Sequence, residues 1–192
     1  LQARFVVSYI GTIGMACGLD VVLRAAGILK ERGDSSIVFL LVGDGASREG
    51  LEKEARTEHL DNVVFTGLQP KERIPDFLSV TDACLVHLRK KDLFKSVLPS
   101  KILEAAAMAR PIILGVQGHA ARLVEEAGMG LCIEPENERE LVAAVEKLSR
   151  DPQAARKMGE AGRRHVAERF DLDALARQYA DVIEKTVAAS SP

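Results

Sequence analysis

Residues 36–43 read SIVFLLVG, a run of six apolar residues that ends in glycine. A run without polar residues is typical of a strand buried on both faces of a parallel sheet. Five further segments have this character, and helical patterns separate them: RFVVSYIG (4–11), NVVFTG (62–67), DACLVHL (82–88), PIILGV (111–116) and GLCIEP (130–135). We therefore predict an α/β fold with a parallel sheet of about six strands and helices on both faces.

The intervening segments have helical spacing. Gly33 ends the first of them, GLDVVLRAAGILKERG (18–33), and Ser47 is a candidate cap for the second. The others are KERIPDFLSV (71–80), interrupted by a proline, SKILEAAAMA (100–109) and AARLVEEAG (120–128), followed by three C-terminal helices (138–151, 152–170 and 171–189). These last helices outnumber the strands beside them, so we expect them to wrap one face of the sheet or to reach another domain.

Composition narrows the classes of function. The 192 residues carry a net charge of −2 and no Trp, which gives no reason to expect nucleic acid as a partner. Cys17, Cys84 and Cys132 lie far apart without metal-ligand spacing, so we expect reduced thiols, a cytoplasmic protein and no metal site. We see no apolar segment long enough to span a bilayer.

A ligand of an open parallel sheet binds at the carboxyl ends of the strands, near the point where the strand order reverses. This rule selects five loops, at residues 11–18, 43–50, 67–72, 87–101 and 115–120. We expect one site where these loops meet.

The first two loops are rich in glycine. In GTIGMACG (11–18), Gly11 and Gly14 would let backbone N–H groups approach a phosphate, although a plain strand-to-helix turn has the same composition. In GDGASREG (43–50), Arg48 occupies the third glycine position of a dinucleotide-binding pattern. A turn followed by a helix cap explains Asp44 and Ser47 at least as well.

The segment PSKILE (99–104) has the most unusual charge pattern. Lys101 falls in the first turn of a helix, where the dipole disfavours a cation unless an anion binds nearby. Glu104, three residues later, could accept hydrogen bonds from the two hydroxyls of a ribose. The alternative is a simple ion pair between Lys101 and Glu104. The other basic residues of this loop, Arg89 among them, are predicted to form a solvated face.

The order of these segments carries a resemblance. The glycine-rich first loop, VFLLVGDG, NVVFTG, DACLV, PSKILEAAAMARPII, GMGLCIEPEN and RDPQAARKMGEAGRRHVAERF occur at the spacing of one family. Together they resemble the C-terminal, donor-binding domain of the group 1 (GT-B fold) glycosyltransferases, in particular bacterial polysaccharide and amino-sugar transferases. The resemblance covers nearly the whole chain.

The resemblance implies a three-layer, Rossmann-like domain over residues 1–192 and an acceptor domain that is absent from this chain. It implies a nucleotide-sugar donor, UDP-linked in most members, transferred with retention of configuration and without metal or other cofactor to a glycan or lipid-linked acceptor. The full-length protein would work in the cytoplasm, at the inner face of the membrane. No catalytic residue is assigned. The predicted donor-binding residues are Gly11, Thr12, Gly14, Gly43, Asp44, Gly67, Leu68, Pro99, Ser100, Lys101 and Glu104.

Glu104 ends the E-x7-E motif of the family and should hold the ribose, while the backbone at Gly67 and Leu68 should meet the uracil. The first acid of that motif falls on Ser96, and the basic residues that clamp the diphosphate in the family fall near Thr12 and Cys17. These losses leave open a degenerate scaffold domain that binds no nucleotide. A second alternative, a UDP-sugar epimerase, would need acids or a histidine in the cleft, and His119 is the only candidate for that role.

Overall fold

The computed structural model of the protein describes residues 4–189. The strands are β1 (Phe5–Ile10), β2 (Ile37–Val42), β3 (Val63–Gly67), β4 (Ala83–His87), β5 (Ile112–Gly115) and β6 (Gly130–Cys132). The α-helices are α1 (Asp20–Glu31), α2 (Arg48–Thr57), α3 (Ile74–Ser79), α4 (Lys101–Ala107), α5 (His119–Glu126), α6 (Glu138–Arg150), α7 (Pro152–Arg169) and α8 (Leu172–Ala189). Short 3-10 helices add η1 (Met15–Cys17), η2 (Lys71–Arg73) and η3 (Asp92–Ser96).

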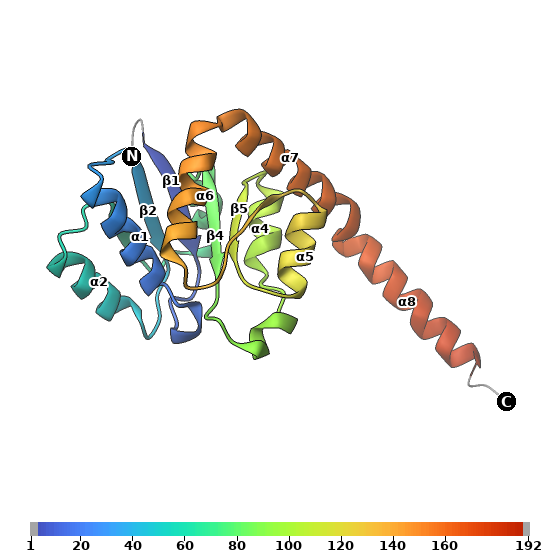
Figure 1. The fold of residues 1–192 in the computed structure, drawn as a ribbon. Helices are drawn as coiled ribbons and strands as arrows, with labels where there is room; N and C mark the ends of the chain where they lie inside the picture. Colours follow the sequence, from blue (N-terminus) through green and yellow to red (C-terminus); the bar gives the residue numbers. More distant parts are fainter. Residues whose placement is uncertain (1–3, 190–192) are drawn as a thin grey trace.

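The six strands form one parallel sheet in the order β3-β2-β1-β4-β5-β6. The order reverses between β1 and β4, so the crevice above their carboxyl ends is where a ligand of such a sheet binds. These ends lie at the bottom of Figure 1, where the loops after β1 and β4 project. The predicted parallel α/β fold is confirmed.

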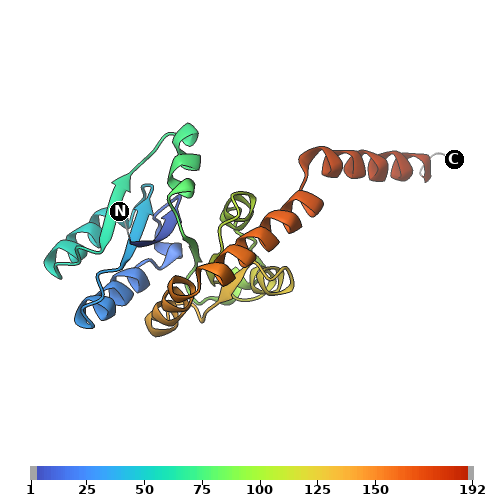
Figure 2. The same cartoon turned by 90° about the horizontal axis from the view of Figure 1, so that it is seen from above.

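Helices cover both faces of the sheet (Figure 2). One core contains residues of α1, α2 and α6 together with alternate strand residues such as Tyr9 and Leu85. The opposite core contains residues of α3, α4 and α5 with the intervening strand residues, such as Val86 and Leu114. Burial on both faces explains why the strands lack the polar alternation of a half-exposed sheet.

Local details differ from the predictions in three places. Ser47 precedes α2, but its side chain makes no capping hydrogen bond. The Asp44 carboxylate accepts from the Gly45 N–H at 2.7 Å within the turn before this helix. The last strand covers only residues 130–132. Residues 92–96 form the 3-10 helix η3, which has no clear periodicity in the sequence.

The C-terminal helices divide in two. α6 joins the α1 side of the core, and α7 crosses to pack on α4. α8 projects away from the sheet (Figures 1 and 2) and exposes apolar side chains at Leu172, Tyr179, Val182 and Ile183. α6 and α7 therefore pack on opposite faces of the sheet and α8 extends outward, while contact with another domain stays a prediction.

Candidate functional site

The loops after β1, β2 and β3 pack directly on one another. The Gly11 N–H donates to the Val42 carbonyl at 2.8 Å, and the Gly43 N–H donates to the Gly67 carbonyl at 3.0 Å. Gly43 has a φ of 137°, and a Cβ there would overlap the Gly11 carbonyl oxygen. Glycine is therefore required at this position by both conformation and space. Three of the predicted site glycines thus lie together at the carboxyl edge.

In the loop after β1, the backbone carbonyl groups are hydrogen-bonded but, within the part of the chain that the structure describes, most of the N–H groups are not. Every carbonyl from residue 12 to residue 17 accepts a hydrogen bond; the donors are the Tyr9 hydroxyl, the N–H groups of Ser47, Cys17 and Arg89, the Arg89 Nε and the His87 ring. By contrast, within residues 4–189 the N–H groups of Thr12, Gly14, Met15 and Ala16 donate no hydrogen bond. A loop with used acceptors and open donors suits an anion.

Lys101 brings a positive charge to this loop from α4. Its Cε and Nζ lie 2.6 and 2.8 Å from where a Cβ of Gly11 would be, so the side chain lies flat against the Gly11 backbone. The ammonium group stands 5.3 Å from the centre of the buried Tyr9 ring. Lys101 and the glycine-rich loop after β1 therefore lie side by side at the carboxyl edge of the sheet.

Lys101 and Glu104 do not neutralise each other. In the described part of the chain, neither side chain takes part in an ion pair or a side-chain hydrogen bond. Glu104 is exposed, and both residues border a narrow cavity that also touches Ser8 and Cys84. The structure thus argues against the simple ion pair and leaves both charges free for a ligand.

The remaining predicted residues surround this centre. Asp44 lies beside it, but its carboxylate pairs with Arg48 at 3.1 Å. Leu68 is 78% exposed at the end of β3. Pro99 and Ser100 form the entry to α4, where their carbonyls accept from N–H groups of its first turn. Binding roles for these four residues stay predictions.

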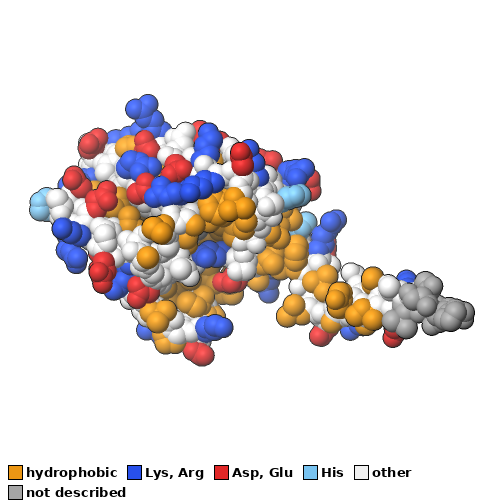
Figure 3. Space-filling view, turned by 90° about the horizontal axis from the view of Figure 1, so that it is seen from below, with side chains coloured by type: hydrophobic (Ala, Val, Ile, Leu, Met, Phe, Trp, Pro, Cys, Tyr) orange, Lys and Arg blue, Asp and Glu red, His pale blue; other side chains and the backbone are white. Residues whose placement is uncertain are grey.

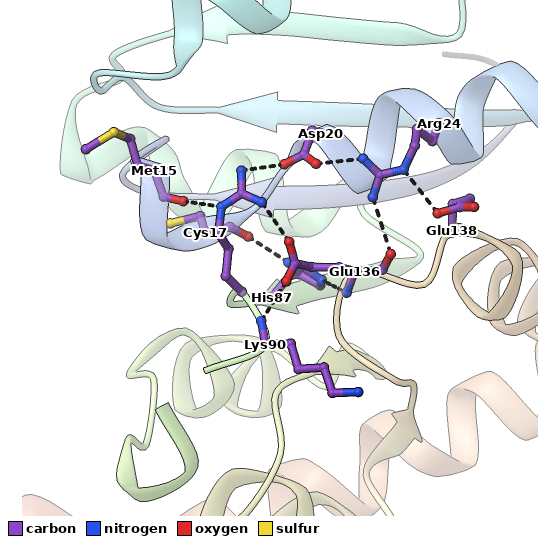
Figure 4. A network of polar contacts seen from close by, with 9 residues as sticks. Met15, Cys17, Asp20, Arg24, His87, Lys90, Glu136 and Glu138 are labelled. Carbon is purple, nitrogen blue, oxygen red and sulfur yellow. Dashed lines mark hydrogen bonds and ion pairs between the residues drawn. The ribbon is translucent and has the colours of Figure 1, made fainter. Parts of the chain in front are cut away.

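Arg89 joins three loops and does not belong to a solvated face, so that prediction is wrong for this residue. Figure 4 shows its guanidinium between Asp20 and Glu136, at 2.9 and 2.7 Å. Glu136 lies in the loop after β6, and Arg24 of α1 extends the network by pairing with Asp20 and Glu138. The network links the loops after β1, β4 and β6 at the edge where the site lies.

His87 is the buried member of this network. Its Nδ1 lies 2.6 Å from the Cys17 carbonyl, which can only accept, and the Glu136 N–H donates to its Nε2 at 2.9 Å. These partners require the neutral ring with the proton on Nδ1. Burial lowers the pKa of His87 below its usual value, consistent with that form.

The carboxylates of the network are held ionised. The Lys90 N–H, which donates to Glu136 at 2.8 Å, together with Arg89, holds the pKa of Glu136 below its usual value. Burial opposes ionisation of Asp20, but its hydrogen bond to Arg24 and the charge of Arg89 lower its pKa nonetheless. Asp20, His87 and Glu136 could not be recognised from the sequence, because each appears there as an isolated polar residue and only the fold brings them together.

His119, the histidine considered for an epimerase, lies exposed at the start of α5, with its Nδ1 3.2 Å from Arg122. The three cysteines are free thiols.

No cluster of His, Cys, Asp and Glu suited to a metal ion occurs within residues 4–189. Over the same residues, every helix is too short or too polar to cross a bilayer.

Figure 3 shows the carboxyl edge from below. Hydrophobic side chains gather on this face, and basic side chains stand among them. Met15 and Leu93, each 74% exposed, lie in the loops after β1 and β4.

These loops and their open donors sit on a fold that is found in known proteins. The pattern described as "Glycosyl transferases group 1" matches residues 2–165. The chain belongs to this family. Its relatives include the alpha-D-kanosaminyltransferase of Streptomyces kanamyceticus, which is 30% identical over 95% of this chain and 46% of its own length. A putative colanic acid biosynthesis glycosyl transferase of Escherichia coli, WcaI, is 29% identical over 91% of this chain and 42% of its own length.

Solved structures show the same fold. HepE of Anabaena, crystallised with UDP, matches with a TM-score of 0.83 and 20% identity over 95% of this chain and 49% of its own. The C-terminal domain of LpcC, a group 1 protein of Francisella tularensis, matches with a TM-score of 0.71 and 19% identity over 88% and 87% of the two chains. The group 1 chain described here spans about half the length of the curated relatives it matches.

Proposed function

We propose that this chain binds the nucleotide of a UDP-linked sugar, and that the protein transfers the sugar to a glycan or lipid-linked acceptor with retention of configuration and without a metal. The acceptor would be held by a second domain outside this chain. A cytoplasmic location and contact with the membrane stay predictions.

The observation that carries the proposal is the loop after β1 with Lys101 against it. Among residues 4–189, four N–H groups without a hydrogen bond and one ammonium group without an ion pair meet at the point where the strand order reverses. Such donors stabilise a diphosphate, and they act most strongly on the charge that develops as the sugar leaves. The transfer then needs positive charge and oriented dipoles from this half of the enzyme.

Glu104 supports the nucleotide part of the proposal. Its carboxylate is exposed, three residues from Lys101, and bound to neither Lys101 nor another described side chain. A free carboxylate near a bound diphosphate can accept hydrogen bonds from the two hydroxyls of a ribose. The choice of UDP follows the UDP bound in HepE, a protein of similar fold.

At the three positions where this chain departs from the family pattern, the side chains present do not replace the missing acid and basic residues. Thr12 is exposed and uncharged, the Cys17 sulfur lies 3.0 Å from the Tyr9 hydroxyl, and Ser96 donates to the Leu93 carbonyl. A scaffold domain that binds no nucleotide is therefore the second candidate function.

Calorimetric titration of the 192-residue chain with UDP, GDP and ADP separates the two. We expect UDP to bind, and Glu104→Gln to weaken it roughly tenfold to a hundredfold, because a hydrogen bond to a charged group contributes about 1.5–3 kcal/mol. Glu126→Gln, an exposed carboxylate in the last turn of α5, is the matched control. Failure of all three nucleotides to bind would favour the scaffold.

Titration with 2′-deoxy-UDP tests the role of Glu104 directly. If the carboxylate holds the ribose, the deoxy ligand binds wild type more weakly, and Glu104→Gln changes its affinity less than that of UDP. An equal loss for both ligands would show that Glu104 acts elsewhere.

A further inference from the structure

We propose that His87, Arg89 and Glu136 are positioning residues for the donor: they hold the loop 11–18 against Lys101 with its N–H groups open to the diphosphate. The inference rests on the proposed function, because it explains how that anion site keeps its shape. None of the three is expected to touch the donor.

His87 and Arg89 donate hydrogen bonds to three consecutive carbonyls of η1. The Arg89 Nε donates to the Met15 carbonyl at 2.9 Å, its backbone N–H donates to the Ala16 carbonyl at 2.9 Å, and His87 donates to the Cys17 carbonyl at 2.6 Å. The N–H groups of Met15 and Ala16 stay unbonded among the described residues. These hydrogen bonds thus fix the turn through its carbonyl groups and leave its N–H groups free to bind a ligand.

Glu136 holds His87 and Arg89 in place. Its carboxylate accepts from the Arg89 guanidinium at 2.7 Å and from the Lys90 N–H at 2.8 Å, and its own N–H donates to His87 at 2.9 Å. The Arg24 guanidinium donates to its carbonyl at 3.3 Å. Glu136 also has a φ of 64°, which a residue with a side chain rarely adopts. Such a conformation persists only where several contacts impose it, as they do here.

The charges of the network exclude a direct role in anion binding. Arg24 and Arg89 pair with three carboxylates, those of Asp20, Glu136 and Glu138. The group has one more carboxylate than guanidinium groups, so it offers a diphosphate no free positive charge. Its contribution to binding is the shape of the loop.

The fold also keeps space for these side chains. A Cβ at Gly115 would overlap the His87 ring, and a Cβ at Gly18 would lie 3.0 Å from the Arg89 Cγ and 3.2 Å from the His87 Cε1. The imidazole therefore occupies a slot between Gly18, in the loop after β1, and Gly115, the last residue of β5. A slot of this kind fixes the direction of the ring, as a positioning role requires.

Two measurements on wild type, Glu136→Gln and Arg89→Lys test the inference, with Glu126→Gln as control. Glu126 is exposed in the last turn of α5 and lies outside the network.

The first measurement is amide hydrogen exchange, without ligand, at Ile13 and Cys17, whose N–H groups donate to the Asp44 and Gly14 carbonyls at 2.8 and 3.0 Å. The second is UDP affinity by calorimetry. We expect faster exchange at these two amides in both test variants. We also expect UDP affinity to fall roughly tenfold to a hundredfold, because displacing binding groups by as little as about 1 Å can cost that much. The control should match wild type.

A third readout separates positioning from a general loss of structure. The ratio of UDP to 2′-deoxy-UDP affinity, which reports on Glu104, should stay at its wild-type value in both test variants. Unchanged exchange in the loop would overturn the inference, and so would unchanged UDP affinity in variants whose loop exchanges faster. If wild type binds no nucleotide, the proposed function fails and the link to the donor fails with it. The exchange data then still decide whether the network shapes the loop.

Discussion

Three helical glycines allow one substitution to be tested in opposite surroundings. Gly27 of α1 and Gly50 of α2 have open space where a Cβ would be placed, whereas a Cβ at Gly159 of α7 would overlap the Ala109 carbonyl oxygen. Gly→Ala within a helix gains about 0.5–1 kcal/mol from lower backbone entropy in the unfolded chain. We therefore expect Gly27→Ala and Gly50→Ala to stabilise the protein by that amount.

Gly159→Ala gains the same propensity but must move α7 away from the end of α4. Overpacking of this kind costs typically about 1–3 kcal/mol, so the net effect ranges from zero to a loss of about 2.5 kcal/mol. Urea denaturation of the three variants and wild type measures these changes, and about 1 kcal/mol corresponds to roughly 2–4 °C in Tm at this size. A Gly159→Ala variant as stabilised as Gly27→Ala would refute the close approach of α7 to α4.

Two further predictions concern titratable groups that are buried or partly buried. Burial raises the pKa of Cys84 and of Cys132 to about 12, so neither thiol should react with iodoacetamide at about pH 8 until denaturant is added; labelling of the native protein at the denatured rate, read by mass spectrometry, would contradict this. Burial, together with the charge of Arg89, lowers the pKa of His87 in the folded protein below the usual 6.5. The charges of Glu136 and Asp20 act in the opposite direction but do not cancel this effect. Because the unfolded chain binds this proton more readily, the free energy of unfolding should fall as pH drops below about 6.5. In His87→Asn that fall should be smaller, and an identical pH profile of urea midpoints would count against a neutral buried ring.

Much of this protein follows from its sequence alone. The apolar run at 37–42 requires burial on both faces, and its alternation with helical segments leaves a covered parallel sheet as the simplest arrangement. The glycines after β1 and β2, and the Lys101 and Glu104 pair at the start of α4, could be recognised because each is unusual within its own short segment. Local chemistry was enough in these cases.

Tertiary structure decided the rest. The network joins residues 20, 87, 89 and 136, which come from three distant parts of the chain: the start of α1, the end of β4 and the loop after β6. Each of them has an ordinary alternative as a solvated polar residue. The open N–H groups of the loop after β1 depend on which carbonyls are occupied, and the donors to several of those carbonyls lie about 70 residues away along the chain. Hydrogen-bond partners separated in this way are set by the order of strands in the sheet, and no local pattern records them.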